Sequence, residues 1–294
     1  MAGDEGRMNW GVERRLEFIE FRLSWEGGVR RADIISTFNV SEPQASKDLA
    51  LYQERAPHNA VYDRNLKRYV AATGFRPVFL KGGPDEYLTR LRSLGERLTD
   101  PDESWIGTRP DIDIVLTPAR EVSGECLREL LAAHRARASI EVRYQSMSAE
   151  RPVPTWRRIS THAFGYDGFR WHARAYCHLT DRFKDFLLPR IIGVRDPGPA
   201  GRGGDEDVLW QERFSILIAP HPALGEEQKA IVAKDYGMRD GVKALEVRYA
   251  MLFYVMKRLN LLGAPESLSP RSQHIVLANR EEADAALRKA DFAF

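Results

Sequence analysis

Residues 169–194 read FRWHARAYCHLTDRFKDFLLPRIIGV, and this stretch decides the fold of the middle of the chain. Polar and apolar residues alternate from Phe169 to Cys177, which is the period of a β-strand with one buried face. A hairpin turn signal, Tyr166-Asp167-Gly168, stands just before this strand. Similar short strand-like runs are Ser139–Tyr144, Asp185–Leu188 and Arg190–Val194. Several short strands at such close spacing predict a small antiparallel barrel.

The two faces of the strand that ends at Cys177 differ in chemistry. The face that suits a barrel core carries Trp171, Ala173, Ala175 and Cys177. The opposite face carries His172, Arg174, Tyr176 and His178. Donors of this kind around an aromatic ring suit an anionic, nucleotide-like ligand. The candidate ligand site therefore comprises Arg143, Tyr144, Ser146, His162, His172, Arg174, Tyr176, Arg182 and Arg190. In the alternative interpretation, Arg174 and Arg190 are structural and pair with Asp181 or Asp185.

Positive charge is concentrated in the same part of the chain. The 294 residues have a formal net charge of only +2, yet residues 135–195 hold 12 basic and 5 acidic side chains, a net charge of +7. The other blocks have net charges of +1 (1–76), −4 (77–134) and −2 (196–294). This distribution indicates an anionic partner for the middle block, or else a solvated basic face.

The N-terminal block is predicted to form three helices and a hairpin. Apolar residues recur at helical spacing from Trp10 to Trp25, and a second short helix is expected from Arg30 to Phe38. Ser41 is a suitable N-cap for a third helix that runs to about Arg55, with Pro43 in its first turn. Two strand-like runs between residues 60 and 70 follow, joined by Asp63-Arg64-Asn65. This order is that of a winged helix-turn-helix in residues 1–76.

A helix that enters a DNA major groove needs short polar side chains in its first turns. The third helix offers Ser41, Gln44, Ser46 and Lys47, of which glutamine suits adenine and lysine suits guanine or phosphate. Glu42 and Asp48 reduce the positive charge of this face. The hairpin tip adds three cations for the DNA backbone or an adjacent minor groove, which are Arg64, Lys67 and Arg68. The alternative is a helical bundle used for protein contact.

The remaining segments surround these two parts. Residues 77–120 read as a helical connector, with one amphipathic helix at Asp85–Leu98, and a Ser-capped helix is expected at Ser123–His134. Pro197–Asp207 reads as a linker rich in Gly, Pro and Asp. Beyond it, a small α+β domain is predicted from a strand, two helices and a final strand, at Phe214–Ile218, Glu226–Lys234, Ala244–Leu262 and His274–Leu277. The apolar run Val247–Leu262 suits core burial or a dimer interface.

The barrel residues also resemble those of a known family. RWHARAYC at 170–177, followed by Asp185-Phe186-Leu187-Leu188-Pro189-Arg190-Ile191, resembles the WYL-domain family of bacterial transcriptional regulators. In that family a Trp-Tyr-Leu-type strand precedes a basic Arg-Ile strand in an Sm/SH3-like barrel, and here Trp171-His172-Ala173 replaces the triplet. The order of parts is most similar to the subgroup that regulates phage-defence loci such as BREX and CBASS. The resemblance covers nearly the whole chain and implies a homodimeric repressor with a ligand-sensing WYL domain.

Together these observations predict a multidomain α+β chain. Its expected parts are a winged helix-turn-helix (1–76), a connector (77–120), a WYL Sm-like barrel (121–196) and a C-terminal extension domain (208–294) for dimer contact or gating. The predicted function is a DNA-binding repressor of an inverted-repeat operator that senses an anionic ligand. The alternative is an RNA- or single-strand-binding adaptor that uses the basic barrel and its interleaved aromatic residues.

Other function classes find little support in the residues. No catalytic set or cofactor site emerges, because the neighbours Cys177 and His178 point to opposite faces of a strand and the glycines at 201–204 lie in a linker. The histidines lack metal-ligand spacing, and two cysteines are too few for a disulfide framework. With no apolar run of membrane-spanning length and no secretory signal pattern, a metal-free cytoplasmic protein that is not an enzyme is expected.

Overall fold

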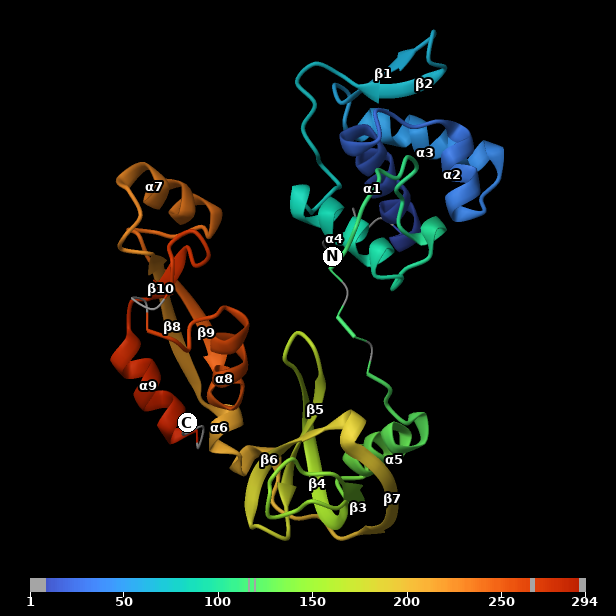
Figure 1. The fold of residues 1–294 in the computed structure, drawn as a ribbon. Helices are drawn as coiled ribbons and strands as arrows, with labels where there is room; N and C mark the ends of the chain where they lie inside the picture. Colours follow the sequence, from blue (N-terminus) through green and yellow to red (C-terminus); the bar gives the residue numbers. More distant parts are fainter. Residues whose placement is uncertain (1–8, 116, 119, 265–267, 291–294) are drawn as a thin grey trace, which may run out of the picture. The chain divides into compact units, whose positions relative to one another are not determined.

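The computed structural model describes residues 9–115, 117–118, 120–264 and 268–290, and Figure 1 shows the fold. The chain divides into two compact units, residues 1–117 and residues 118–294. The α+β class expected from the sequence is confirmed, since each unit contains both helices and a sheet. No helix within the described residues combines the length and the apolar character that crossing a membrane requires.

The first unit begins with the three helices and the hairpin that the sequence predicts. These elements are α1 (Trp10–Trp25), α2 (Arg31–Phe38), α3 (Glu42–Arg55), β1 (Ala60–Asp63) and β2 (Arg68–Ala71). The strands pair antiparallel, with Tyr62 opposite Tyr69. The core contains the fully buried side chains of Leu16, Phe18 and Tyr52. The apolar spacing in α1 and the Ser41 cap of α3 thus lead to the expected winged helix-turn-helix arrangement.

Several side chains between residues 79 and 106 pack against this same core. Helix α4 (Pro84–Gly95) is followed by the short 3₁₀ helix η1 (Pro101–Glu103), and Leu80 and Trp105 are buried among the side chains of α1 and α3. The helix expected to continue to Leu98 ends at Gly95, and Leu98 is exposed. The segment predicted as a connector is therefore an integral part of the first unit's core.

A buried carboxylate attaches this segment to α1. Glu20 is 0% exposed, and its oxygens accept hydrogen bonds from the backbone N–H groups of Val78, Phe79 and Leu80 at 2.6–2.9 Å. The hydroxyl of Tyr52 and the side-chain amide of Asn59 donate to the same carboxylate at 3.1 and 3.4 Å. Because backbone and side-chain donors together satisfy the buried charge, Glu20 fixes the start of the segment.

The second unit contains a five-stranded antiparallel sheet with the order β6-β5-β4-β3-β7. Its elements are α5 (Gly124–Arg135), β3 (Ser139–Tyr144), β4 (Thr155–Tyr166), β5 (Trp171–Cys177), β6 (Arg182–Leu187), the 3₁₀ helix η2 (Leu188–Arg190) and β7 (Ile191–Gly198). The sequence pattern did not predict β4, the longest strand. Its alternation is interrupted by a register shift between Thr161 and Ala163, which changes the face of every later side chain.

The remainder of the second unit is a three-stranded antiparallel sheet with helices, in the order β10-β8-β9. Its elements are η3 (Gly204–Glu206), α6 (Val208–Gln211), β8 (Arg213–Pro220), α7 (Glu226–Asp235), β9 (Lys243–Arg248), α8 (Tyr249–Arg258), β10 (Ile275–Leu277) and α9 (Arg280–Lys289). The helix predicted from Ala244 is wrong in its first part. Residues 243–248 pair with β8, so they form a strand, and the helix begins at Tyr249.

Candidate functional site

Helix α3 presents the residues predicted to contact DNA from its first turns. The hydroxyl of Ser41 caps the helix by accepting a hydrogen bond from the backbone N–H of Gln44 at 3.3 Å. The hydroxyl of Ser46 donates to the Glu42 carbonyl at 2.9 Å. Lys47 is exposed, and within the described part of the chain its side chain makes no hydrogen bond or ion pair. Lys47 is therefore the residue of this group that is freest to meet a partner.

Asp48 does not reduce the positive charge of the exposed face of α3, although the sequence suggests that it does. It is 1% exposed, and Arg15 of α1 binds it through Nε at 2.6 Å and Nη2 at 3.2 Å. Gln44 donates to the same carboxylate through Nε2 at 2.9 Å. The negative charge is thus neutralised inside the unit, and the bond also holds the Gln44 side chain in position on the helix.

The wing is shaped by local backbone geometry. At its tip, Asp63 Oδ1 accepts hydrogen bonds from the backbone N–H groups of Asn65 and Leu66 at 2.8 and 2.9 Å, which forms an Asx turn. Arg64 and Lys67 lie exposed at this tip, and Lys67 has a positive φ of 50°. Arg68 is partly buried. The three basic residues predicted for the wing thus differ in their freedom to reach DNA.

A third extended segment anchors the wing to the helices. The backbone of Val29 exchanges two hydrogen bonds with Tyr69, at 2.8 and 2.9 Å. Just before it, Gly28 has a φ of 136°, and a Cβ at this position would lie 2.3 Å from the Tyr69 carbonyl oxygen. Only glycine allows this close approach, so Gly28 sets the position of the wing relative to α2.

Between the wing and the start of α2 and α3 lies a cationic cleft with a volume of about 520 Å³. Its charged lining residues are Arg30, Arg31, Lys67, Arg68 and Glu42. Glu42 is bound by Arg31 at 2.5 Å, so the excess of positive charge remains. Sequence reasoning missed Arg30 and Arg31, although two adjacent arginines after Gly27-Gly28 are a visible signal. A cationic cleft beside an exposed helix face is suited to a DNA backbone.

In the second unit, strand β5 is buried on both faces. Ala173, Ala175 and Cys177 are fully buried in the core, as predicted, but Trp171 is 50% exposed and packs against Tyr166. Placing Trp171 in the core is therefore wrong, because it lies opposite Tyr166, beside the turn that closes the β4–β5 hairpin. On the other face, His172 and Arg174 are only 1% and 4% exposed. The sequence pattern did not predict that the face with His172 and Arg174 is also buried.

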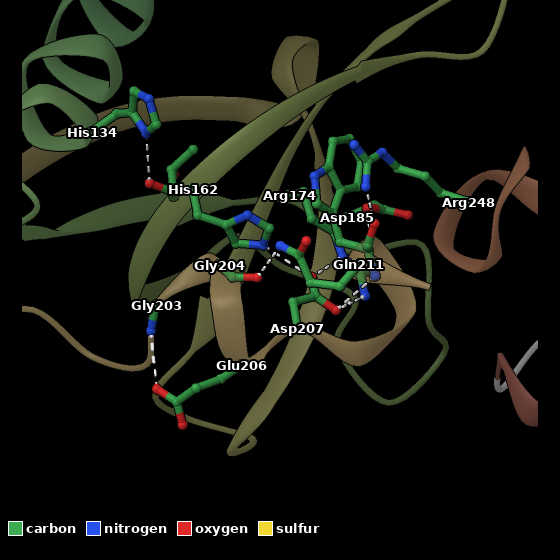
Figure 2. Close-up of polar contacts among 12 residues, drawn as sticks. His134, His162, Arg174, Asp185, Gly203, Gly204, Glu206, Asp207, Gln211 and Arg248 are labelled. Carbon is green, nitrogen blue, oxygen red and sulfur yellow. Dashed lines mark hydrogen bonds and ion pairs between the residues drawn. The ribbon is translucent and has the colours of Figure 1, made fainter. Parts of the chain in front are cut away.

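Arg174 is enclosed by carboxylates, as Figure 2 shows. Its Nε and Nη2 donate to the two oxygens of Asp207 at 2.7 and 3.0 Å, and Nη1 donates to Asp185 at 3.3 Å. His162 Nε2 lies 2.9 Å from Asp207 Oδ2. Asp207 was assigned to a linker from its sequence context, yet it is 1% exposed and caps α6 by accepting from the backbone N–H of Trp210. The segment that leads into the C-terminal part thus binds the five-stranded sheet through a buried charge cluster.

The cluster strongly favours its charged forms. Burial by itself would raise the pKa of Asp207, but hydrogen bonds from His162 and Arg174 outweigh it and lower the pKa to about 2. Since the carboxylate is ionised, His162 must donate from Nε2. For Arg174, burial opposes the charge, but Asp207 and Asp185 raise the pKa above its ordinary value. The geometry agrees with the alternative interpretation of Arg174 as a structural residue, with Asp207 as its main partner.

A second buried pair lies nearby. His172 Nε2 and Arg170 Nε each lie 3.0 Å from Asp167 Oδ2. Burial would raise the pKa of Asp167, but these bonds and two backbone N–H groups lower it to about 2. The His172 ring also packs against Tyr254 of α8 at 4.8 Å, and the Tyr254 hydroxyl donates to Asp185 at 3.2 Å. Burial and Asp185 raise the pKa of the Tyr254 phenol, which keeps it a donor.

The other residues of the candidate ligand site do not converge on one pocket. Tyr144 and Ser146 line a cavity of about 340 Å³, Arg174 and Arg182 line one of about 680 Å³, and His162 lines one of about 720 Å³. Tyr176 donates to Asp181 beside the strand. Arg143 is exposed, Arg190 is partly buried, and neither lines any of these three cavities. A residue that the sequence did not single out, Arg157, lines the smallest cavity.

Two free cysteines and no metal-binding cluster are found among the described residues. Across the described ranges there is no group of three or more His, Cys, Asp or Glu side chains that could hold a metal ion. Cys126 and Cys177 are both buried and free, and Cys177 is 0% exposed in the barrel core. Ser160, rather than a thiol, contacts His178, at 3.0 Å.

Comparison with known families matches this architecture along the chain. Residues 11–93 match the BrxR transcriptional regulator winged helix-turn-helix domain, and residues 125–196 match the WYL domain. Residues 213–283 match the BrxR transcriptional regulator C-terminal dimerization domain. The resemblance to WYL-domain regulators stated from the sequence is therefore confirmed.

Individual relatives extend over almost the whole length. The chain is 40% identical to the DNA-binding transcriptional repressor CapW of Stenotrophomonas maltophilia, over 98% of this chain and 96% of that protein. It is 34% identical to CapW of Escherichia coli strain KTE188, over 95% and 93% of the two chains, and 35% identical to CapW of Pseudomonas aeruginosa, over 93% and 91%. Identity at this level, over both units, shows that the chain belongs to the CapW family of DNA-binding transcriptional repressors.

Proposed function

We propose that this chain is a homodimeric transcriptional repressor that binds duplex DNA with its winged helix. The observation that carries the proposal is the cationic cleft between α2, α3 and the wing, beside the exposed Lys47. The side chains of Gln44, Ser46 and Lys47 are the proposed base or phosphate contacts, with Ser41 fixing the helix start. Arg64, Lys67 and Arg68 of the wing hold the backbone. The names of the relatives support the same activity.

Two copies explain how such a protein selects an operator. The match of residues 213–283 to a dimerization domain supports pairing through the C-terminal part. A two-fold dimer presents two recognition helices, so it binds an inverted repeat and doubles the number of phosphate contacts. Release then requires that a ligand bind the DNA-competent and incompetent dimers with unequal affinity.

The barrel is the proposed sensor of that ligand. Its segment carries a net charge of +7, which favours an anionic or nucleic-acid-derived molecule. The similarity to BrxR regulators supports control of a phage-defence locus, in which repression is lifted when such a molecule accumulates. We further propose that the protein acts in the cytoplasm, where its operator lies, and that it carries no enzymatic activity.

Titration of the protein against DNA from upstream of its own gene tests the first part of this proposal. We expect a footprint on an inverted repeat and an affinity that falls steeply with salt concentration. Lys47→Ala is expected to weaken operator binding about tenfold, the effect of losing one good contact. Lys234→Ala, at an exposed position on α7, is the matched control and is expected to bind as the wild type does. Wild-type affinity of the Lys47 variant would show that α3 is not the recognition helix.

A second candidate function has one specific observation in its favour. The β4–β5 hairpin exposes three aromatic side chains, Tyr166, Phe169 and Trp171, each about half exposed. Aromatic rings on a basic barrel can stack with unpaired bases, as in an RNA- or single-strand-binding adaptor. Competition of duplex against single-stranded DNA and RNA for the full-length protein decides between the two functions. Preference for single strands, reduced by Trp171→Ala and not by Lys47→Ala, would favour the adaptor.

A further inference from the structure

Gln44 lies at the border between the buried and the exposed face of α3. Residues three and four positions apart are neighbours on a helix, so Gln44 is beside both the exposed Lys47 and the buried Asp48. Gln44 itself is half-buried, and its Nε2 donates a hydrogen bond to Asp48 Oδ1 at 2.9 Å. The amide is thus held from the interior, at the edge of the surface that we propose faces DNA.

The bond to Asp48 also sets which end of the Gln44 amide faces inward. A carboxylate paired with an arginine only accepts hydrogen bonds, so the amide turns its NH2 group toward Asp48 and not its oxygen. Among the described residues, no hydrogen-bond donor reaches Gln44 Oε1. The carbonyl oxygen and the second N–H of the amide therefore remain for a partner outside the chain.

Arg15 of α1 fixes the same carboxylate from another direction. Its Nε donates to Asp48 Oδ2 at 2.6 Å and its Nη2 donates to Oδ1 at 3.2 Å, and the two side chains are only 12% and 2% exposed. An arginine that binds a carboxylate through two N–H groups sets the orientation of the carboxylate as well as its position. A residue of α1 therefore controls the direction of a side chain on α3.

An amide held in this way distinguishes adenine from guanine. Adenine presents a donor at N6 and an acceptor at N7 in the major groove, which match one carbonyl oxygen and one N–H. Guanine presents two acceptors, at O6 and N7, and the Gln44 amide has already given one of its two N–H groups to Asp48. Because the side chain is ordered before DNA binds, less conformational entropy is lost on binding.

We propose that Arg15 and Asp48 are positioning residues that make Gln44 specific for adenine at one base pair of each operator half-site. They act through the Gln44 amide and without contacting the base themselves. The inference rests on the proposed binding of duplex DNA by α3, and it adds the base that is read and a residue of α1 that determines the choice. Asp48, whose charge the sequence places against DNA binding, then contributes to specificity.

Binding of the full-length protein to a set of altered operators tests this proposal. Starting from the footprinted inverted repeat, each base pair of the half-site is replaced in turn by the other three, in both half-sites, and the affinity for each duplex is measured by fluorescence anisotropy. The variants are Gln44→Ala, Arg15→Met, the conservative Arg15→Lys and the isosteric Asp48→Asn. Gln53→Ala, at an exposed position later on α3, is the matched control. A melting curve accompanies each variant.

The expected result is a change at one position only. Wild type prefers adenine there by about tenfold, and Gln44→Ala loses this preference and keeps those at the other positions. Arg15→Met and Asp48→Asn lower the same preference by roughly threefold or more, since an asparagine also donates and no longer holds the amide in one orientation. Arg15→Lys keeps a cation beside Asp48 and most of the preference, and Gln53→Ala matches wild type at every position.

Three results would overturn the inference. The first is that Gln44→Ala loses an adenine preference at no position. The second is that Arg15→Met and Asp48→Asn both keep the wild-type preference, and the third is that they weaken binding to all duplexes by one common factor, as a loosened fold would. If Arg15→Met does not fold, Asp48→Asn decides alone. When wild type binds the operator and Lys47→Ala weakens it, any of these results refutes this inference and leaves the repressor proposal in place, whereas a wild type that does not bind duplex DNA refutes both.

Discussion

Replacement of Arg174 by methionine tests whether the buried charge cluster holds the second unit together. The side chain makes two hydrogen bonds to Asp207 at 2.7 and 3.0 Å and one to Asp185 at 3.3 Å, and both Arg174 and Asp207 are almost fully buried. Arg174→Met leaves Asp207 buried with His162 and one backbone N–H as partners. Breaking a buried pair from one side costs about 3–5 kcal/mol. We expect the free energy of unfolding to fall by about that amount.

Urea denaturation of a double-mutant cycle provides the assay. Arg174→Met and Asp207→Asn are each expected to destabilise the protein, and the double variant is expected to lose less than the sum of the two. Arg143→Met is the control, since Arg143 is exposed and forms no ion pair within the described residues. Its unfolding free energy should change by about 0.5 kcal/mol or less.

A small effect would refute the structural interpretation. If Arg174→Met lowers the unfolding free energy by less than about 1 kcal/mol, the arginine is not committed to Asp207. It would then be available to an external anion, as the pattern on β5 first suggested. Additive effects of the two single variants would lead to the same conclusion, because residues that interact directly are expected to be coupled.

Acid should lower the free energy of unfolding of the second unit. Asp207 and Asp167 have pKa values of about 2, below the ordinary 3.8. The stabilisation that they contribute is therefore complete above about pH 5 and is lost as the pH falls toward 2. Each contributes about 2 kcal/mol, and unfolding measured from pH 6 to pH 2 should show a shallower pH dependence in Asp207→Asn. In the first unit, Glu20→Ala leaves buried backbone donors unpaired and should cost about 3 kcal/mol or more, checked by thermal unfolding against Glu54→Ala, which is exposed on α3. Gly28→Ala places a Cβ 2.3 Å from the Tyr69 carbonyl oxygen, so it should displace the wing and weaken operator binding in a gel-shift titration, whereas unchanged affinity would show that the wing is not needed.

Local patterns determined much of the fold. Helical spacing in α1, the Ser41 cap of α3 and the alternation in β3 and β5 each depend on residues close together in the chain, so they can be read without a structure. The same holds for the position of the wing, because Asp63-Arg64-Asn65 forms a turn from its own side chain. The wrong or missing predictions concern segments whose structure depends on pairing with another strand. Residues 243–248 form a strand because β8 lies beside them, and a register shift conceals the alternation of β4.

Tertiary structure decided which polar residues are free. In the sequence, Arg174 and Arg157 are both arginines of a basic segment, and nothing local shows which of them has a carboxylate partner. The fold brings Asp207, which is 33 residues away, onto Arg174, whereas Arg157 has no ion pair within the described residues. Charge pairing inside a protein depends on distances between remote segments, and the energy of a buried charge depends on the partners within a few ångströms. The sequence by itself therefore determined a winged helix-turn-helix followed by a basic barrel, while only the packing of distant segments decided which of its cations remain available to a ligand.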